Sequence, residues 1–485
     1  MGRAALFCLV LLGVIVAGSV EAPERAGARP LVTGVTVPDT GEVQDPLAYE
    51  RIKATGASMT RIIVYWSWVA PAKKPDDWNP TDPSDPNYRW DLFDQQIQMA
   101  VDAGLDPLVM VYSAPKWAER CQDPAAGICD PDPQAFAQFS EAVAKRYNGD
   151  FEGLPRVRYW EPWNEANLFL FFKPQFEKGR KVSPLLYRDL LNGFSDTVKG
   201  VNPDNQIVAG GLAPIERPGG LGPLDFARRL LCMKGRNKPA PKPGCDATAR
   251  FDIWANNPYT TGGPTHQSNG EDDVSLGDLR EMGALLKAAK RAGKIETDLN
   301  RVPFWITEFS WDSKPPDPGG LPMGLLSRWT SEAMFRAWQA GVSKFFWLTL
   351  RDWPRPAGLP YSETIESGLY FRGATLEQDK PKRVLKAFRF PFVAFRKANG
   401  IAVWGRTPES TPGRVFLSYR LGSRRRDLGL VKASSSGVFR TMVKTNLGRN
   451  YRGKIRAEFG ADRSIPFSLR QVKDRWHPPF GRKTP

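Results

Sequence analysis

Histidine is almost absent from this chain of 485 residues, which contains only His266 and His477. A zinc site built from histidines, or from closely spaced cysteine pairs, therefore lacks its usual ligands. The chain also has neither a glycine-rich phosphate-binding loop nor the Gly-x-Ser-x-Gly turn of a serine nucleophile. These absences disfavour metal, nucleotide and serine-hydrolase chemistry, and we expect a reaction that needs no cofactor and no metal.

Long apolar runs are equally scarce, and the one near the N-terminus is short. Residues 4–17 are mostly apolar and lie between Arg3 and the segment Val20-Glu21-Ala22. A charged start, a short apolar stretch and a small-residue cleavage site are typical of a signal peptide. A membrane span would need about 20 apolar residues. We therefore expect residues 1–22 to be a signal peptide, and the protein to be secreted without a membrane anchor.

Cysteine is also rare, and its spacing is informative. Cys8 lies in the apolar run, which leaves Cys121, Cys129, Cys232 and Cys245. Three pairings are possible, and a zinc site is a further alternative. In an exported protein, local disulfides that join Cys121 to Cys129 and Cys232 to Cys245 are the interpretation that fits best.

Charge is distributed unevenly along the chain. Residues 396–485 hold 21 Lys and Arg against 5 Asp and Glu, so they account for the entire formal net charge of +16. Such asymmetry is typical of a segment with a separate task. One hypothesis is adhesion to an anionic polymer, such as an acidic polysaccharide or an envelope phosphate polymer. The alternative is a packing-only appendage, and nucleic acid is not expected because no recognition motif is present.

Short β-like runs alternate with helical patterns over most of the chain. Helical spacing is clearest at 134–147, 185–201, 276–292 and 326–340. Eight such strand–helix repeats favour a (β/α)₈ barrel over residues 31–395. A doubly wound sheet is the alternative, but it would more often place a glycine-rich turn after its first strand. The predicted strands are 31–35, 59–65, 107–112, 157–161, 206–210, 251–256, 302–307 and 344–348.

The pattern changes after residue 391. Short alternating runs are separated there by Gly, Ser, Pro and Asn, which is typical of a small antiparallel β-sandwich. We therefore predict a basic accessory domain over residues 396–485. Its predicted strands are 401–404, 414–419, 428–432, 438–443, 453–459 and 466–472.

Two glutamates occur where predicted barrel strands end. Glu165 closes Trp160-Glu161-Pro162-Trp163-Asn164-Glu165, and Glu308 lies in Trp305-Ile306-Thr307-Glu308-Phe309. Catalytic groups of such barrels lie at the carboxyl ends of the strands. Two carboxyls about 5–5.5 Å apart, one protonated and one ionised, are the requirement for retaining glycoside hydrolysis. Arg61 is the candidate cation that keeps one of them ionised, and Glu161, inside its strand, is interpreted as a structural carboxylate.

These motifs resemble those of the retaining glycoside hydrolases of clan A, most closely family 39 or family 5-like enzymes. The resemblance covers about residues 31–390 and implies a (β/α)₈ enzyme acting on an oligo- or polysaccharide. Where the clan has proline after the glutamate and histidine before the Pro-Tyr, this chain has Ala166 and Asn257, and His266 lies nearby. The resemblance implies that Glu165 is the acid/base, that Glu308 is the nucleophile and that Asn164 contacts the sugar 2-hydroxyl. It also implies that Tyr259 orients the nucleophile, that Arg61 is the arginine near the nucleophile and that Trp347 is the floor of the cleavage subsite.

Aromatic and acidic residues near the predicted strand ends are further candidates for sugar contacts. Trp117, after the third strand, is the preferred one beside Trp347, because aromatic faces pack on the C–H faces of pyranose rings. Other functions stay open, namely a catalytically inactive glycan-binding barrel or a cell-surface adhesion protein that works through its basic domain. The remaining candidates are Trp66, Trp68, Trp163, Trp311, Asp312 and Asp352.

Overall fold

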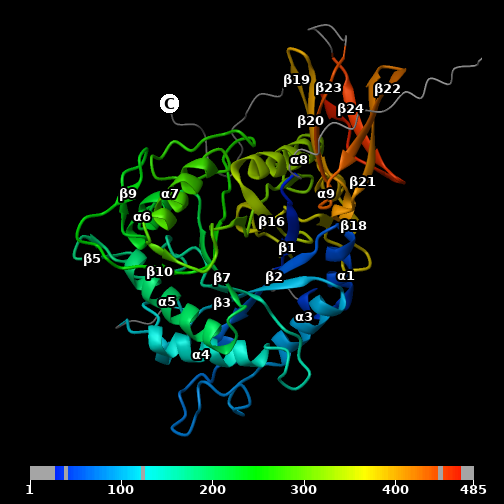
Figure 1. Ribbon diagram of the computed structural model, residues 1–485. Coiled ribbons are helices and arrows are strands. Elements are labelled where there is room, and N and C mark those ends of the chain that lie inside the picture. Colours follow the sequence, from blue (N-terminus) through cyan, green and yellow to red (C-terminus); the bar gives the residue numbers. More distant parts are fainter. Residues whose placement is uncertain (1–27, 38–41, 122–125, 446–451, 471–485) are drawn as a thin grey trace, which may run out of the picture.

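The computed structural model describes residues 28–37, 42–121, 126–445 and 452–470, so the predicted signal peptide lies outside the described residues. Eight parallel strands close into a barrel in the order β1-β16-β13-β11-β7-β4-β3-β2 (Figure 1). The predicted barrel is confirmed. Its strands are β1 Val32–Thr36, β2 Met59–Tyr65, β3 Asp106–Tyr112, β4 Tyr159–Pro162, β7 Gln206–Leu212, β11 Ile253–Asn256, β13 Phe304–Ile306 and β16 Val342–Leu348.

Each barrel strand is followed by a helix on the outside of the barrel (Figure 1). Two of these helices, α1 and α4, begin at a proline behind an aspartate cap; Asp132, for example, accepts a hydrogen bond from the Ala135 backbone N–H at 2.8 Å. A proline there costs little because the first helical N–H has no partner within the helix. The helices are α1 Pro46–Ala54, α3 Asp91–Asp102, α4 Pro133–Arg146, α5 Ser183–Val201, α6 Pro223–Leu230, α7 Leu279–Arg291, α8 Met323–Ala340 and α9 Arg383–Arg389.

Short elements decorate the loops of the barrel. The four-residue helix α2, Trp66–Val69, directly follows β2. Single-turn 3₁₀ helices occur at Glu42–Gln44, Lys116–Ala118, Tyr361–Glu363 and Pro408–Ser410. The two-residue strands are β5 Phe176–Glu177, β6 Arg180–Lys181, β8 Met233–Lys234, β9 Ala240–Pro241, β10 Ala249–Arg250, β12 Ile295–Glu296, β14 Ser313–Lys314, β15 Leu321–Pro322, β17 Tyr370–Phe371 and β18 Lys380–Pro381.

Apolar side chains fill the interior of the barrel. Lys344, at the amino end of β16, is held among them by aromatic faces, with its amine 3.8 Å from the Tyr159 ring and 4.2 Å from the Trp305 ring. A packed interior confines polar chemistry to the carboxyl ends of the strands. The interior cluster consists of Met59, Leu108, Val208, Ile253, Ala255, Trp305 and Phe346.

Two antiparallel sheets follow the barrel, as predicted (Figure 1). Strand β19 was not predicted as a strand, and it crosses the expected domain boundary at residue 395. The smaller sheet contains β19 Phe392–Lys397, β20 Gly400–Arg406 and β23 Val438–Val443. The larger contains β22 Arg424–Ala433, β21 Gly413–Leu421, β24 Lys454–Phe459, β25 Asp462–Arg463 and β26 Phe467–Ser468.

The two sheets pack against helix α8 of the barrel. The rings of Trp404 and Phe335 lie 5.5 Å apart, and those of Trp404 and Trp338 lie 5.8 Å apart. Arg406 is fully buried and donates a hydrogen bond to the Thr33 hydroxyl of β1 at 3.0 Å. The same apolar core therefore extends from the barrel into the C-terminal sheets.

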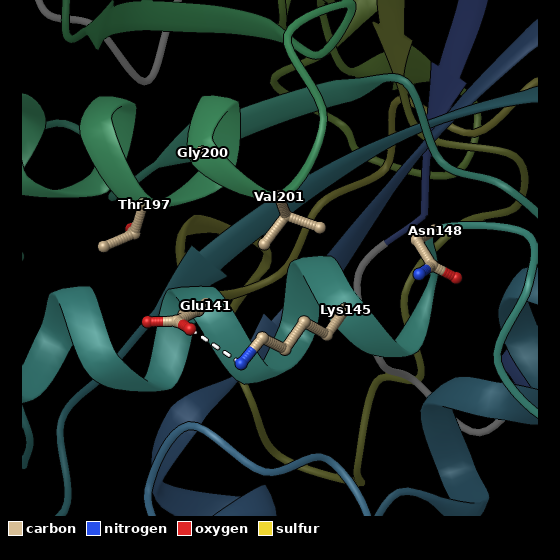
Figure 2. A pocket seen from close by; sticks show the side chains of 6 residues that line it. All are labelled: Glu141, Lys145, Asn148, Thr197, Gly200 and Val201. Carbon is tan, nitrogen blue, oxygen red and sulfur yellow. Dashed lines mark ion pairs between the residues drawn. The ribbon is translucent and has the colours of Figure 1, made fainter.

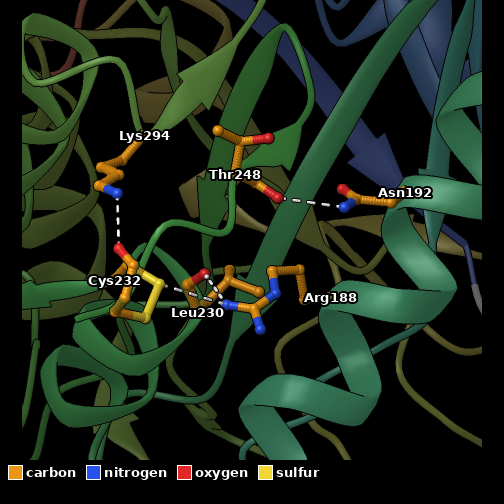
Figure 3. The surroundings of a disulfide bond; sticks show 7 residues. Arg188, Asn192, Leu230, Cys232, Thr248 and Lys294 are labelled. Carbon is orange, nitrogen blue, oxygen red and sulfur yellow. Dashed lines mark hydrogen bonds between the residues drawn. A yellow bond between two sulfur atoms is a disulfide. The ribbon is translucent and has the colours of Figure 1, made fainter.

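Both predicted disulfides are present, joining Cys121 to Cys129 and Cys232 to Cys245. The second one closes the loop that follows α6. Arg188 of α5 donates to the Leu230 carbonyl at 3.2 Å beside the Cys232 sulfur and so connects the end of α6 to α5 (Figure 3). None of the helices in the described ranges is long and apolar enough to cross a membrane.

Candidate active site

The chain bends sharply where β4 ends. Trp163 and Glu165 both adopt left-handed backbone conformations, with φ of 70° and 41°. Such conformations are strained for residues other than glycine, by about 1–3 kcal/mol each, and they cluster at functional sites. The bend is fixed by hydrogen bonds from the Trp163 N–H to the Val111 carbonyl at 2.9 Å and from the Glu165 N–H to the Gly211 carbonyl at 3.2 Å. Asn164 and Glu165 are thereby held at the mouth of the barrel.

Arg61, inside β2, connects that strand to β4 and to the segment after β13. Its guanidinium donates to Glu161 at 2.6 Å, to Glu308 at 2.5 Å and to the Asn164 side-chain oxygen at 3.2 Å. Burial disfavours the charged guanidinium, but the two carboxylates outweigh burial and raise the pKa of Arg61 above its ordinary value. The predicted pairing of Arg61 with one of the two motif glutamates is present, and its partner is Glu308.

Glu308 follows β13 by two residues and is held from two sides. Arg61 donates to its Oε1, and the Tyr259 hydroxyl donates to its Oε2 at 3.3 Å. Burial and the neighbouring carboxylates Glu308 and Glu165 raise the pKa of Tyr259 well above its usual value, so the phenol keeps its proton. Both donors fix the orientation of the Glu308 carboxylate.

Glu165 has a different environment, although it lies close enough to Glu308 for the two charges to interact. Burial and the negative charge of Glu308 raise the pKa of Glu165 to about 8. Asn257 donates a hydrogen bond to Glu165 Oε1 at 3.0 Å and opposes this rise. At neutral pH, Glu165 therefore holds a proton beside a carboxylate that is ion-paired.

Asn257, the departure from the clan pattern, is an integral part of this arrangement. The Thr307 hydroxyl donates to the Asn257 side-chain oxygen at 2.9 Å, and this bond turns the amide N–H₂ toward Glu165. The contact between Asn257 and Glu165 was not predicted. Its only signal in the sequence is the position of Asn257 directly before Pro258-Tyr259.

Glu161 lies fully buried in β4 and pairs with Arg61. Burial raises the pKa of Glu161, and the charge of Arg61 and its hydrogen bond oppose that rise. Arg61 is thus shared by two carboxylates, one inside the barrel and one at its mouth. This position agrees with the interpretation of Glu161 as a structural carboxylate.

The predicted aromatic contacts occupy different depths. Trp347 is fully buried in β16, where its indole N–H donates to the Ser367 carbonyl at 2.8 Å. Trp117 is half-buried and packs edge-on against Trp66 and Trp78, with ring centroids 5.8 Å and 5.1 Å away. Their contact with a sugar stays a prediction. Trp66, Trp163 and Trp311 are buried, and Trp68 is exposed.

The two aspartates considered for hydroxyl binding are already engaged by the protein. Lys382, itself buried, donates to Asp352 and also to the Ser313 hydroxyl, the latter at 2.8 Å. Asp312 accepts from the Glu366 N–H at 2.8 Å. Burial raises the pKa of both aspartates to about 6. His266, half-buried, accepts a hydrogen bond from Ser275 through its backbone carbonyl at 3.0 Å.

A hollow of about 490 Å³ lies between α4 and α5 on the outside of the barrel (Figure 2). Its acidic and basic side chains, Glu141 and Lys145, form an ion pair at 2.7 Å within α4. Asn148, Thr197, Gly200 and Val201 complete the lining. The hollow shares no residue with the carboxylates at the barrel mouth. Within the described ranges, no group of three or more His, Cys, Asp or Glu side chains is arranged to hold a metal ion.

No family model matches the sequence, and no curated protein matches it. The fold is similar to that of a family 39 glycoside hydrolase from the gut symbiont Bacteroides cellulosilyticus WH2, with a TM-score of 0.53 and 15% identity over 86% of this chain and 81% of that chain. It is also similar to a monomeric β-xylosidase from Caulobacter crescentus CB15, with a TM-score of 0.50 and 14% identity over 87% of this chain and 96% of that chain. At such identities the likeness shows a shared fold, an eight-stranded parallel barrel with helices around it.

Proposed function

We propose that this chain is a retaining glycoside hydrolase with Glu308 as nucleophile and Glu165 as general acid/base. The observation that carries the proposal is the contrast between two neighbouring carboxyls. Glu308 is ion-paired with Arg61, whereas the pKa of Glu165 is raised to about 8. One ionised and one protonated carboxyl is the combination that this reaction needs.

The proposed reaction has two steps. A Glu308 oxygen attacks the anomeric carbon while the bond to the leaving oxygen breaks and Glu165 gives that oxygen its proton. Water then attacks the glycosyl-enzyme, Glu165 takes a proton from the water, and Glu308 leaves as a carboxylate. Arg61 and Tyr259 hold Glu308 in place. By resemblance, Asn164 contacts the sugar 2-hydroxyl and Trp347 lies beneath the sugar.

The test is hydrolysis of aryl β-glycosides of xylose, glucose, mannose, galactose and arabinose. Glu308→Gln should lose several orders of magnitude in kcat, because no nucleophile remains. Glu165→Ala should lose activity on a poor leaving group such as methylumbelliferone, and much less on dinitrophenol, which departs without a proton. The matched control is Glu141→Gln, in the hollow outside the barrel.

Two outcomes would contradict the proposal. A Glu308→Gln variant with the wild-type rate would exclude Glu308 as nucleophile. Saturable oligosaccharide binding with no hydrolysis of any substrate would favour a glycan-binding barrel. Retention of anomeric configuration in the first product, followed by NMR, distinguishes this mechanism from inversion.

We also infer that the protein is secreted and acts on oligo- or polysaccharides. Its two disulfides support an oxidising compartment.

A second proposal concerns the larger C-terminal sheet, which we propose binds an anionic polysaccharide. Arg420 of β21 lies directly between Arg425 of β22 and Lys454 of β24, so three cations lie side by side on one face. Like charges directly opposite each other destabilise a sheet. Arg425 has ion pairs with Glu458 at 3.5 Å and Asp427 at 3.7 Å, whereas the salt bridges of the described residues include none for Arg420 or Lys454. A bound polyanion would remove that repulsion.

The full chain with Arg420, Arg425 and Lys454 changed to Gln should elute from a polygalacturonate column at lower salt than the wild type. The control carries the same charge change at the exposed barrel residues Arg180, Lys234 and Lys238. Equal elution of the two variants would overturn the proposal.

A further inference from the structure

Trp68 differs from the other tryptophans near the barrel mouth because it is exposed. Its relative exposure is 47%, whereas Trp66 and Trp163 are fully buried. Trp68 lies in α2, the single helical turn that directly follows β2. An exposed large aromatic side chain at the carboxyl end of a barrel strand lies where such barrels bind their ligands.

The orientation of Trp68 is fixed by its neighbour. The Trp68 and Tyr65 rings are stacked, with centroids 4.2 Å apart and planes 25° apart. Stacking covers one face of the indole, and the exposed fraction of the side chain leaves surface for a ligand. A platform that is already oriented loses little conformational entropy when a ligand binds to it.

A chain of ring contacts leads from Trp68 to the carboxylates. Tyr65 contacts Tyr112 edge-on at 6.1 Å, and Tyr112 contacts Trp163 edge-on at 5.1 Å. Trp163 directly precedes Asn164 and Glu165 in the bend after β4. The exposed platform is therefore joined to the candidate active site through the ends of β2, β3 and β4.

A second exposed apolar group follows Glu165 on the same side of the barrel. Phe169 and Leu170 are 37% and 51% exposed in the loop after β4. Phe171, next in sequence, has its ring centroid 6.4 Å from that of Tyr112. Phe169 and Leu170 thus directly precede, in the sequence, a residue of the aromatic cluster around Tyr112, and large exposed apolar side chains at a barrel mouth are typical of ligand-binding surfaces.

We infer that Trp68 is the platform of a second sugar subsite, which stacks on a pyranose ring adjacent to the one that is cleaved. The inference rests on the proposed function and extends it to substrate class. The substrate is then an oligo- or polysaccharide, and the protein binds at least one sugar ring beyond the one whose bond is cleaved. Aromatic faces suit this ligand because the C–H face of a pyranose is apolar while its hydroxyls stay in water.

The experiment compares two kinds of substrate in the full chain. Glycosyl fluorides present only the attacked sugar, whereas β-linked xylo-, gluco-, manno- and galacto-oligosaccharides of two to six rings reach further subsites. Trp68→Ala should lower kcat/KM for the oligosaccharide that the wild type cleaves by about tenfold, corresponding to about 1.4 kcal/mol. The same variant should hydrolyse the fluoride of the same sugar at the wild-type rate.

Conservative and remote variants separate stacking from folding. Trp68→Tyr keeps an aromatic face and should recover most of the oligosaccharide activity. Met442→Ala, on β23 and also 47% exposed, should change neither activity. If Trp68→Ala lowers kcat/KM equally for both kinds of substrate, the substitution damages the site in general. If it leaves oligosaccharide hydrolysis unchanged, Trp68 has no part in binding the substrate. Either result overturns the inference.

Binding distinguishes this inference from the proposed function. Oligosaccharide affinity of the Glu308→Gln variant, measured by calorimetry, should fall about tenfold when Trp68→Ala is added. If the wild type hydrolyses nothing but the Trp68-dependent affinity is found, the glycosidase proposal fails and Trp68 is a sugar-binding platform without cleavage beside it. If hydrolysis is found and Trp68→Ala leaves the affinity unchanged, the subsite fails alone.

Discussion

At the scale of single residues, the site depends on what surrounds two chemically identical side chains. Glu308 receives hydrogen bonds from Arg61 and Tyr259, and Glu165 receives one from Asn257. A guanidinium offers charge as well as a hydrogen bond, whereas an amide offers only the latter. The raised pKa of Glu165 follows from its burial and from the negative charge of Glu308, which the hydrogen bond from Asn257 only partly opposes.

The rate should depend on pH through Glu165. Its pKa is raised to about 8, and the first step needs its proton, so kcat/KM should fall as the pH rises through about 8. Asn257→Ala removes a hydrogen bond that favours the ionised form, which raises the pKa of Glu165 further. The basic limb of the pH–rate profile should therefore move to higher pH in this variant.

Tyr259→Phe is the control for this prediction. It removes a hydrogen bond to Glu308 rather than to Glu165. It should lower kcat while the basic limb stays in place. A basic limb that moves to lower pH in Asn257→Ala would contradict the assignment of Glu165 as the acid.

The sequence predicted some of these residues better than others. Glu165 and Glu308 could be placed because a strand's carboxyl end is recognisable from an apolar run followed by polar residues. Arg61 could be noticed because it is a charged residue inside an apolar strand. The bond from Asn257 to Glu165 could not be predicted, since it joins residues 92 positions apart through side-chain orientation. The exposure of Trp68 likewise depends on neighbours that are distant in sequence.

At the scale of elements, the barrel strands follow their apolar runs closely. β2 spans Met59–Tyr65, as predicted, and β16 begins two residues before its predicted start. Strand β19 was missed because its first half, Phe392 to Ala394, is buried and reads as a continuous apolar junction. β19 is a strand because it pairs with β20. The pattern of apolar and polar residues within β19 does not indicate that pairing.

The contact between β20 and α8 should contribute strongly to stability. Trp404 is buried and packs on Phe335 and Trp338. Trp404→Ala should lower the free energy of unfolding by about 3–5 kcal/mol, since a buried aromatic ring is lost and a cavity remains. Urea unfolding followed by far-UV circular dichroism measures the change.

Met442→Ala, at an exposed position of the same sheet, should change the free energy of unfolding by less than about 0.5 kcal/mol. Activity of Trp404→Ala at 25 °C should stay at the wild-type level, because the contact lies on α8 rather than at the strand ends that carry the carboxylates. If Trp404→Ala lowered the free energy of unfolding as little as Met442→Ala does, the sheets would not stabilise the barrel.

At the scale of the whole molecule, charge and packing divide the chain differently. Residues 1–395 have no net charge, and residues 396–485 carry all +16, which suggests two separate parts. Packing joins them, because one apolar core contains residues from both. Charge separates the two parts although packing joins them, because the charges lie on exposed strands such as β22 while the apolar residues of β19 and β20 face the barrel.

Removing the C-terminal sheets should therefore damage the barrel itself. In a chain that ends at Pro391, Thr33 loses the hydrogen bond from Arg406, and Arg328 loses the Phe467 ring, 3.9 Å away. The apolar face of α8 would be exposed as well, and a large exposed apolar patch promotes aggregation. The full chain should unfold in a single calorimetric transition. The shortened chain should have a much lower melting temperature, or light scattering should show that it does not form a soluble monomer. A shortened chain with the wild-type melting temperature and full activity would show that the barrel folds independently of its basic partner.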